Sequence, residues 1–371
     1  MKAVILVGGE GTRLRPLTYS TPKTMVPILN RPFLEHMLKY MKNHHIDDVV
    51  LALCYLPDHI REYFGDGSDR GVKLTYVVEG SPLGTAGAVK NVAQHLNETF
   101  FVFNGDVFTD MDLSAMLETH RNKSAKATIA LTPVDDPTMY GVVETDTNGR
   151  VKRFVEKPKR EAVTTNMINA GIYILEPSLL DYIPANQSYT FERGLFPLLL
   201  ERDDPFYSFN SHGYWIDIGT PEKYMQVNSD LLAGDITTDF PGSAYSRNVW
   251  TEAGCNIHPK AKLDGPVVIG RNCVIEAKAH IKGPTVIGPD CYIGTDSLVE
   301  KSIIWQNVKV GRGAKLLKCL IADAVSVGEG CDVAAGCIIG NKVSMKKRIK
   351  LAPDTKIMPG ETLYASKNTS G

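Results

Sequence analysis

Apolar and polar residues follow two different rhythms along the 371-residue chain. In the first part, short apolar runs rich in Val, Ile and Phe are separated by segments with helical spacing. The runs that suit buried strands are 3–7, 48–53, 74–79, 100–106 and 127–132. Apolar residues recur at helical spacing from Phe33 to Met41 and again after Asp112. Alternation of strands and helices predicts an α/β domain with a mostly parallel sheet and helices on its faces.

The last helix of this part is expected at 221–234, because Pro221 suits a first helical turn and Gly234 suits a helix end. We therefore expect a first domain at 1–236 and a Pro/Gly/Ser-containing linker at 237–250. In parallel sheets of this kind, ligands bind beyond the carboxyl ends of the strands. A glycine-rich stretch at 8–18 and the tripeptide NGD at 104–106 both fall there.

In the second part, apolar residues recur every six positions. The fifteen positions are Ile257, Leu263, Ile269, Ile275, Ile281, Ile287, Ile293, Val299, Ile304, Val310, Leu316, Ile321, Val327, Val333 and Ile339, with a one-residue slip before Ile304 and before Ile321. Glycine follows many of these anchors. A hexapeptide period with this glycine pattern predicts a parallel β-helix with a C-terminal tail at 251–371, with about five coils. The tail at 346–364 is expected to cap the last coil or to pack on the first domain. It resembles the left-handed β-helix of hexapeptide-repeat proteins.

Six of the seven cysteines lie in the β-helix region, each two residues before an anchor. Ala261, Ala279, Thr285 and Ser297 occupy equivalent positions, so this position requires a small inward-facing side chain. The chain has no CxxC pair and an odd number of cysteines, which argues against a disulfide framework or a zinc site.

The formal net charge of -1 and the charged content of 22% give no field that would favour nucleic acid or an anionic membrane. Any anion site must therefore be local. The first apolar run is too short for a signal peptide or a membrane span. We expect a cytoplasmic protein that binds neither nucleic acid nor membrane.

The stretch GGEGTRLRPLT at 8–18 raises three alternatives: a plain tight turn, a dinucleotide site and a triphosphate site. Leu14 stands where the dinucleotide pattern GxGxxG requires its third glycine, and the GKS or GKT of a Walker A loop is absent. Arg13, Arg15 and Lys23 supply cations close by. Glycine amides and fixed cations together suit the phosphates of a nucleoside triphosphate.

Here the sequence resembles the sugar-1-phosphate nucleotidylyltransferases, the nucleotide-sugar pyrophosphorylases. GGEGTRLRPLT is followed by TPKTMVPILNRP at 21–32, and six further motifs appear in the family's order. They are EGSPLGTAGAV at 79–89, FNGDVFTD at 103–110, YGVVE at 140–144, FVEKP at 154–158, NAGIYI at 169–174 and YWIDIGTPEKY at 214–224. The β-helix matches the longer members, so the resemblance covers nearly the whole chain. It implies a Rossmann-like nucleotidyltransferase domain followed by a left-handed β-helix.

The implied reaction is attack of a sugar-1-phosphate oxygen on the α-phosphorus of a nucleoside triphosphate, with pyrophosphate leaving. The nucleophile is already an anion, so alignment and charge neutralisation are needed rather than a general base. Asp106 and Asp217 match the family's metal-binding aspartates and imply Mg²⁺ as cofactor.

The resemblance also assigns the remaining site residues. Arg13, Lys23 and Lys157 are implied as catalytic cations, the first two on the triphosphate and the third on the sugar phosphate. Nucleotide contacts are implied for Leu6, Gly8, Gly9, Gly11, Thr12, Arg13, Glu79, Leu83, Gly84 and Thr85, and sugar-phosphate contacts for Gly141, Glu156, Lys157 and Asn169. Glu156 and Lys157 are neighbours, so both can serve one site only if the chain kinks there, and Pro158 favours such a kink.

The base is inferred from Glu79. Guanine offers two adjacent donors that suit a carboxylate, whereas uracil and thymine place carbonyls on both sides of their single N–H. We therefore expect GTP and mannose-1-phosphate as substrates and GDP-mannose as product, in the manner of the mannose-1-phosphate guanylyltransferase branch. A thymidylyl- or uridylyltransferase acting on glucose-1-phosphate is the alternative.

For the β-helix we expect assembly of a homo-oligomer, because a short solenoid must cap its ends or pair its faces. Acyl transfer is a weaker alternative, since no inserted loop interrupts the six-residue period. A noncatalytic, nucleotide-sugar-sensing regulatory subunit is another. The complete set of Arg13, Lys23, Asp106, Lys157 and Asp217 favours an active enzyme.

Overall fold

The computed structural model describes residues 1–236 and 240–364. The chain forms two compact units, which are described separately: Met1–Glu10 with Leu34–Asp217, and Gly11–Phe33 with the chain from Ile218 onward. Among the described residues, no helix has the length and apolar character needed to cross a membrane.

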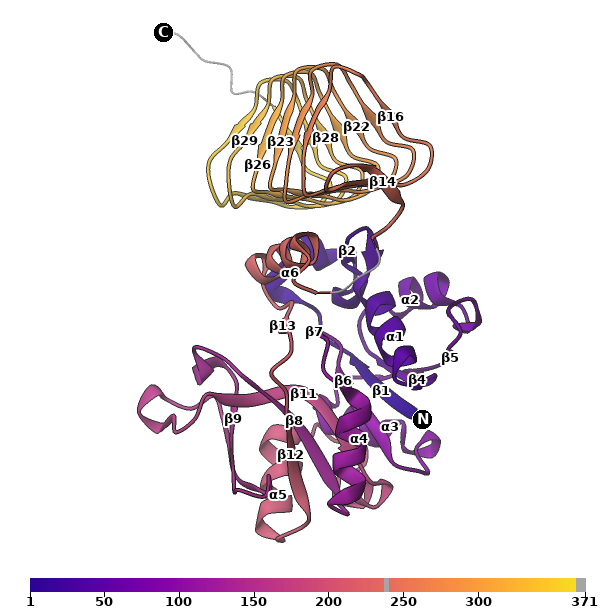
Figure 1. The fold of residues 1–371 in the computed structure, drawn as a ribbon, viewed down its shortest axis with the longest axis vertical. Coiled ribbons are helices and arrows are strands. Elements are labelled where there is room, and N and C mark those ends of the chain that lie inside the picture. The colour runs from indigo at the N-terminus through magenta and orange to yellow at the C-terminus, as the bar shows by residue number, and fades with distance from the viewer. Residues whose placement is uncertain (237–239, 365–371) are drawn as a thin grey trace. The chain divides into compact units, whose positions relative to one another are not determined.

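The first unit is built on a nine-stranded sheet (Figure 1). Its main path runs β10-β9-β11-β6-β1-β4-β5, and off this path β8 pairs with β11 and β12 pairs with β8. The strands are β1 Lys2–Val7, β4 Asp48–Leu53, β5 Lys73–Val78, β6 Phe100–Asn104, β8 Ala127–Pro133, β9 Gly141–Thr145, β10 Val151–Glu156, β11 Met167–Leu175 and β12 Phe206–Asn210. Strands β6, β1, β4 and β5 are parallel, which confirms the predicted Rossmann-like α/β fold, and β11 adds an antiparallel half. A separate ribbon pairs β7 Val107–Thr109 with β13 Trp215–Asp217.

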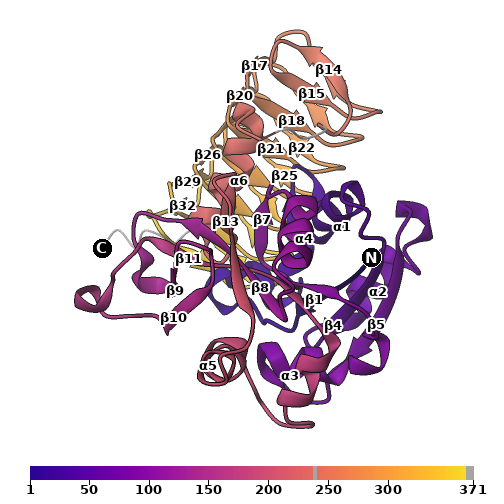
Figure 2. The same cartoon turned by 60° about the horizontal axis from the view of Figure 1, so that its bottom comes forward.

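Helices cover this sheet. They are α1 Phe33–Asn43, α2 Pro57–Phe64, α3 Gly84–Asn91, α4 Leu113–Asn122 and α5 Phe196–Glu201. One hydrophobic core joins α3 and α5 to strands β1, β6, β8 and β11. Helix α4 lies on the other face of the sheet from α3 and α5 (Figure 2). Asp112 caps α4 by accepting a hydrogen bond from the Ala115 N–H at 3.0 Å.

The second unit contains α6 (Pro221–Ala233) and the β-helix. The termini of α6 are as predicted: Pro221 lies in the first turn, and Gly234 ends the helix with a left-handed φ of 87°. The hydroxyl of Thr220 accepts a hydrogen bond from the Lys223 N–H at the start of the helix.

The left-handed β-helix winds through three stacks of short parallel strands, and its coils are visible in Figure 1. The first stack is β14 Ser243–Ser246, which is antiparallel, then β15 Val249–Thr251, β18 Val267–Ile269, β21 Thr285–Ile287, β24 Ile303–Ile304, β27 Leu320–Ile321, β30 Ile338–Ile339 and β33 Lys356–Ile357. The second is β16 Asn256–Ile257, β19 Val274–Ile275, β22 Tyr292–Ile293, β25 Lys309–Val310, β28 Ser326–Val327, β31 Ser344–Met345 and β34 Thr362–Leu363. The third is β17 Lys262–Asp264, β20 His280–Lys282, β23 Leu298–Glu300, β26 Lys315–Leu317, β29 Asp332–Val333 and β32 Lys350–Leu351.

The expected number of about five coils is too low, because the stacks contain seven, seven and six parallel strands. The stretch expected as a C-terminal tail forms β32, β33 and β34 of these stacks. Met345, Leu351, Ile357 and Leu363 continue the six-residue period and face the same core as the earlier anchors. The basic residues between these anchors make the six-residue period harder to recognise in the sequence.

The cysteines of the β-helix have the structural role that their register predicts. Cys273, Cys291, Cys319, Cys331 and Cys337 are buried in the core of the β-helix, and Cys255 packs against it. The thiols donate hydrogen bonds to backbone carbonyls, as from Cys273 to Gly288 at 3.1 Å, except that of Cys319, which pairs with the Ser302 hydroxyl at 3.5 Å.

The remaining part of the second unit is Gly11–Phe33. It contains the short 3-10 helices η1 Thr12–Leu14, η2 Leu17–Tyr19 and η3 Lys23–Met25, and a hairpin of β2 Pro27–Ile28 and β3 Arg31–Pro32. Of the expected linker 237–250, positions 237–239 lie outside the described residues, and the described part contains β14 and the start of β15. The expected β-helix domain 251–371 ends in residues 365–371, which also lie outside them.

Candidate active site

The carboxyl end of β1 leads into the first two glycines of the site. Leu6 pairs with Ala52 of β4 and Asn104 of β6, and its carbonyl accepts a hydrogen bond from the Gly105 N–H at 3.1 Å. A Cβ added at Gly8 would meet only the Cys54 Cβ at 3.5 Å, and one added at Gly9 would meet nothing within 4 Å. Packing within the chain therefore does not require glycine at these two positions, whereas close approach of a ligand to the backbone would.

Gly11 has a different reason to be glycine. Its φ is 62°, and an added Cβ would lie 3.0 Å from Thr18 Cγ2 and 3.2 Å from Lys23 Cβ. Gly11, Thr12, Arg13 and Lys23 all belong to the second unit and lie on or beside η1 and η3. The other predicted site residues belong to the first unit.

Asp106 and Asp217 lie at the same end of the β7–β13 ribbon. Asp217, the last residue of β13, pairs in register with Val107, the first residue of β7, and Asp106 directly precedes Val107. Asp217 also accepts a hydrogen bond from the Tyr140 hydroxyl at 3.0 Å. Tyr140 packs edge-on against Trp215 with ring centroids 5.5 Å apart, and the Trp215 indole donates to the Ala170 carbonyl. These contacts orient the Asp217 carboxylate.

The donor set of the two aspartates fits a divalent metal that is completed by substrate. Among residues 1–236 and 240–364, no group of three or more His, Cys, Asp or Glu side chains is arranged to hold a metal ion. Magnesium is usually held by one or two carboxylates together with phosphate oxygens and water, so two aspartates are enough as protein ligands. The Oδ1 atom of Asn104, two residues before Asp106, is buried without a hydrogen-bond partner in the described chain and provides a further oxygen in this region.

Glu79 lies directly after β5 and is 7% exposed. Its Oε2 accepts a hydrogen bond from the Leu83 N–H at 3.0 Å, and the Leu83 carbonyl accepts one from the Tyr189 N–H at 2.8 Å. Burial raises the pKa of Glu79, and the Leu83 N–H partly offsets this shift. The carboxylate therefore has one oxygen tied to the start of α3 and a second oxygen not used in that contact.

Gly84 and Thr85 attach the start of α3 to the segment around Tyr189. Gly84 has a φ of 72°, and an added Cβ would lie 2.7 Å from the Tyr189 carbonyl oxygen. The Thr85 hydroxyl donates to Glu192 Oε2 at 3.0 Å and accepts from the Phe191 N–H at 3.0 Å. The side chain of Thr85 is thus fully engaged within the protein.

Gly141, Glu156 and Lys157 are joined by the β9–β10 pair. Gly141 pairs with Glu156, and a Cβ at Gly141 would lie 2.5 Å from Phe154 Cζ and 3.1 Å from Glu156 Oε2. The kink expected at this point lies at Lys157 itself, which has a φ of 48° and donates its N–H to the Tyr140 carbonyl. The Lys157 ammonium group is 3.9 Å from Glu156 Oε1. Burial and then the nearby Glu192 raise the pKa of Glu156.

Asn169 is located at an irregularity in β11, where the register with β8 shifts between Asn169 and Tyr173. Its Nδ2 donates to the Tyr173 hydroxyl at 2.9 Å and its Oδ1 accepts from the Gly171 N–H at 2.9 Å. Gly171 has a φ of 75°, and an added Cβ would lie 2.7 Å from Asn104 Nδ2. One Nδ2 hydrogen of Asn169 remains for another acceptor.

Sequence reasoning missed several residues of this region. Tyr140 and Trp215 stand in the quoted motifs beside Gly141 and Asp217, so their position was a usable signal. Tyr173 also stands in a quoted motif, NAGIYI at 169–174, whereas Glu192 had no comparable signal. Burial, and after it the charge of the Glu192 carboxylate, raises the pKa of the Tyr173 hydroxyl.

Comparisons with known proteins identify the class. The family model described as Nucleotidyl transferase matches residues 2–234, and that described as EIF2B subunit epsilon LbH domain matches residues 246–351. The first match covers more than half of the chain, so the chain belongs to the nucleotidyl transferase family. It is an enzyme of that class, and such enzymes generally use a divalent metal.

Individual relatives are similar over most of the chain. The chain is 37% identical to the UTP--glucose-1-phosphate uridylyltransferase of Synechocystis sp., over 91% of this chain and 92% of that protein. It is 42% identical to the mannose-1-phosphate guanylyltransferase of Mycobacterium tuberculosis, over 72% of this chain and 75% of that protein. It is 39% identical to the mannose-1-phosphate guanyltransferase of Eremothecium gossypii, over 92% and 96%.

Among solved structures, HddC from Yersinia pseudotuberculosis complexed with GMP-PN is 31% identical, with a TM-score of 0.54 over 62% of this chain and 99% of that chain. A putative glucose-1-phosphate thymidylyltransferase from Bacillus anthracis is 26% identical, with a TM-score of 0.58 over 64% and 97%.

Proposed function

We propose that this enzyme transfers a guanylyl group from GTP to mannose-1-phosphate, forming GDP-mannose and pyrophosphate. The observation that carries the choice of base is Glu79, a buried carboxylate at the end of β5 with one oxygen tied to Leu83. A carboxylate only accepts hydrogen bonds, which suits the adjacent N–H groups of guanine and opposes the carbonyls of uracil or thymine. The names of the relatives from Mycobacterium tuberculosis and Eremothecium gossypii support the same substrates.

In the proposed mechanism, a phosphate oxygen of mannose-1-phosphate attacks the α-phosphorus of GTP. A new P–O bond forms, and the bond from the α-phosphorus to the bridging oxygen of the β-phosphate breaks. Because the nucleophile is an anion, the protein needs to align the two substrates and offset their charge. Arg13 and Lys23 are proposed to bind the triphosphate and the departing pyrophosphate, and Lys157 the sugar phosphate.

The other predicted site residues are proposed to contact the triphosphate, the base, the sugar and the metal ion. Leu6, Gly8, Gly9, Gly11 and Thr12 present backbone groups to the triphosphate, and Gly84 and Thr85 present theirs to the base. Glu156 and Asn169 bind sugar hydroxyls, next to the backbone of Gly141. Asp106 and Asp217 are proposed to hold Mg²⁺, which when bound supplies positive charge against the phosphate oxygens.

We propose that the enzyme acts in the cytoplasm, where nucleoside triphosphates are available, and as a homo-oligomer assembled through the β-helix. A second candidate function is uridylyl transfer to glucose-1-phosphate, which is favoured by the relative from Synechocystis sp. that matches nearly the whole chain.

The test is a pyrophosphate-release assay with Mg²⁺ over a grid of GTP, UTP, dTTP and ATP against mannose-1-phosphate and glucose-1-phosphate. The proposal requires the highest kcat/KM for GTP with mannose-1-phosphate. A maximum for UTP or dTTP with glucose-1-phosphate would replace it by the second candidate or its thymidylyl counterpart. Absence of turnover for every pair, with tight binding of a nucleotide-sugar, would indicate a regulatory subunit.

A further inference from the structure

The Gly11–Phe33 segment is unusual in its attachments. Its two ends continue into Glu10 and Leu34 of the first unit, yet the segment itself belongs to the second unit with α6 and the β-helix. Hydrogen bonds within that unit join it to α6 and the β-helix: Leu29 to Asn228, Asn30 to Ile287, and Tyr224 to Pro27. The segment also carries Arg13 and Lys23.

The contact point is the tip of the β2–β3 hairpin. Leu29 and Asn30 both have positive φ, 46° and 66°, as a two-residue type I′ turn requires. This conformation is common for asparagine and unfavourable for leucine. The Leu29 N–H donates to Asn228 Oδ1 at 3.0 Å, and Asn30 Nδ2 donates to the Ile287 carbonyl of β21 at 2.8 Å. The strained turn is therefore held by α6 on one side and by the β-helix on the other.

Helix α6 links the hairpin to the β-helix a second time. The Tyr224 hydroxyl donates to the Pro27 carbonyl at 2.5 Å and accepts from the Trp305 indole N–H at 3.0 Å. Asn228 lies one turn later on the same face of α6, and its Nδ2 donates to the Tyr224 carbonyl at 2.9 Å. Tyr224, Asn228 and Trp305 are all buried, so the network is shielded from water.

Trp305 breaks the local pattern of the β-helix. The residues that follow the equivalent strands in the two coils before and the two coils after it are Gly270, Gly288, Ala322 and Gly340. The corner is tight, since a Cβ added at Gly288 would lie 2.5 Å from the backbone carbon of Trp305. In the two coils on either side this position takes glycine or alanine, so a tryptophan here serves no need of these coils. Its indole N–H instead bonds the one tyrosine that holds Pro27.

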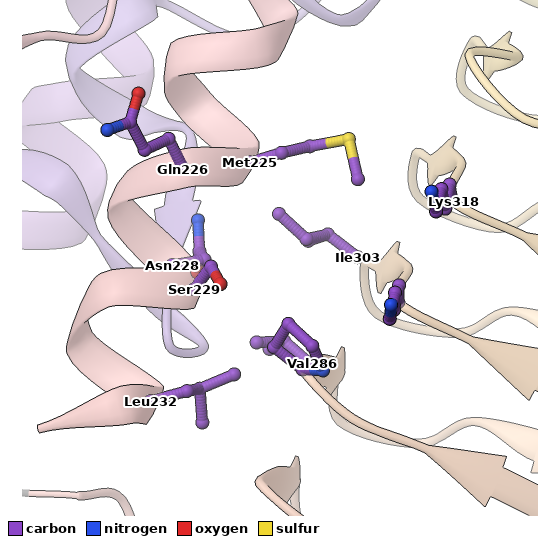
Figure 3. Close-up of a pocket in the computed structure, with 10 residues that line it drawn as sticks. Met225, Gln226, Asn228, Ser229, Leu232, Val286, Ile303 and Lys318 are labelled. Carbon is purple, nitrogen blue, oxygen red and sulfur yellow. The ribbon is translucent and has the colours of Figure 1, made fainter.

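Part of the contact between α6 and the β-helix is open. A cavity of about 240 Å³ lies there, lined by Met225, Asn228, Ser229 and Leu232 of α6 and by Val286, Ile303 and neighbouring residues of the β-helix (Figure 3). Because side chains do not fill this space, apolar packing contributes less there than in a closed interface. The hydrogen bonds of Tyr224, Asn228 and Trp305 accordingly carry more of the connection.

We propose that Asn30, Tyr224, Asn228 and Trp305 are positioning residues that let the β-helix hold the Gly11–Phe33 segment in the form that binds the triphosphate. The β-helix is then a working part of the nucleotidyl transfer reaction in addition to any role in assembly. This inference rests on the proposed function, since it takes Arg13 and Lys23 as the residues that bind triphosphate and pyrophosphate.

The test uses the full-length chain with Asn30→Gly and Tyr224→Phe. Glycine keeps the positive φ of the turn and removes only the bond to Ile287; phenylalanine keeps the ring and removes the hydroxyl. The matched control is Asn272→Gly, at a φ of 56°, which removes a bond to Asp290 inside the β-helix. For both test variants we expect KM for the triphosphate, and for pyrophosphate in the reverse reaction, to rise about two- to tenfold, the factor supplied by one hydrogen bond. In both test variants, KM for the sugar-1-phosphate is expected to stay within about twofold of wild type. In the control variant, the KM values for all substrates are expected to stay within about twofold of wild type.

Amide hydrogen exchange of residues 11–33, measured without substrate, separates this proposal from the proposed function. Faster exchange in Asn30→Gly but not in Asn272→Gly, together with the selective rise in KM, supports the proposal. Unchanged exchange, or faster exchange with unchanged triphosphate KM, overturns it, as does an equal rise in both substrates' KM values. If the wild-type chain turned over no substrate pair, only the proposed function would be refuted. The positioning role would then be tested by the affinity of the same variants for pyrophosphate, which should be weaker than that of wild type.

Discussion

The Glu79→Gln variant replaces one carboxylate oxygen by an NH₂ group at the residue proposed to select the base. In the structure, Glu79 Oε2 accepts the Leu83 N–H at 3.0 Å. The amide oxygen of glutamine can take over that bond, which places the NH₂ group where the second carboxylate oxygen stood. A donor then faces the N–H groups of guanine, whereas the same donor suits a pyrimidine carbonyl.

The magnitude follows from the bonds exchanged. Loss of a hydrogen bond to a charged group costs about 1.5–3 kcal/mol, so kcat/KM for GTP should fall about 10- to 150-fold. A new neutral hydrogen bond to UTP or dTTP adds about 0.5–1.5 kcal/mol, so the GTP/UTP preference should shift by about 30-fold or more. Stability should not fall, because burial raises the pKa of Glu79 and the neutral amide is easier to bury.

The assay is pyrophosphate release with each triphosphate in turn, alongside thermal unfolding. Glu156→Gln is the matched control, since Glu156 is another carboxylate whose pKa is raised by burial. It should change KM for the sugar-1-phosphate and leave the preference for the base as it is. An unchanged GTP/UTP ratio in a folded Glu79→Gln enzyme would refute the assignment of guanine to this carboxylate.

Three further predictions concern other parts of the molecule. Asp217→Asn keeps the size of the side chain and an acceptor for the Tyr140 hydroxyl, but removes the charge proposed to hold Mg²⁺. We expect kcat to fall about 100-fold or more while the melting temperature is unchanged. Full activity across a Mg²⁺ titration would contradict the metal role. Gly141→Ala places a Cβ 2.5 Å from Phe154 Cζ, so urea unfolding should show a loss of about 1–3 kcal/mol and kinetics a raised KM for the sugar-1-phosphate; wild-type stability would show that the Phe154 ring yields freely. Burial raises the pKa of Asp323 from 3.8 to about 6, so the folded protein holds the carboxyl proton more tightly than the unfolded chain does. The stability that this protonation contributes is therefore fully present below about pH 4 and is lost as the pH rises through about 6. Asp323→Asn should therefore be more stable than wild type by up to about 3 kcal/mol at pH 8, with the difference shrinking toward pH 4 in urea unfolding, and a difference that did not depend on pH would disprove the buried charge as its cause.

The fold was largely predictable because both rhythms of the sequence have simple physical causes. Buried parallel strands need continuous apolar runs, and the coils of a β-helix need one inward side chain every six residues. The predicted β-helix was too short at its C-terminal end, because the six-residue repeat was not followed beyond Ile339. Met345 and Leu351 lie among basic residues, yet a β-helix core accepts any apolar anchor at the right spacing, so the repeat extends to Leu363.

The candidate site was predictable only where a motif marked it. Asp106, Asp217, Gly141 and Glu156 stand in quoted motifs, and the structure gives local reasons for their positions, such as the pairing of Gly141 with Glu156. Glu192 has no pattern around it. Its carboxylate accepts a hydrogen bond from the Thr85 hydroxyl, 107 residues away along the chain, and that contact exists only in the folded protein.

By itself, the sequence determined the two architectures, the family resemblance and the chemistry of the cations and carboxylates, because these depend on residue type and on short spacings. Tertiary structure decided which distant residues share a hydrogen bond. The kink at Lys157, the orientation of Asp217 by Tyr140, and the attachment of the Gly11–Phe33 segment to Asn228 and Ile287 are of this kind. A hydrogen bond acts over about 3 Å, so its partners are known only after the chain has folded.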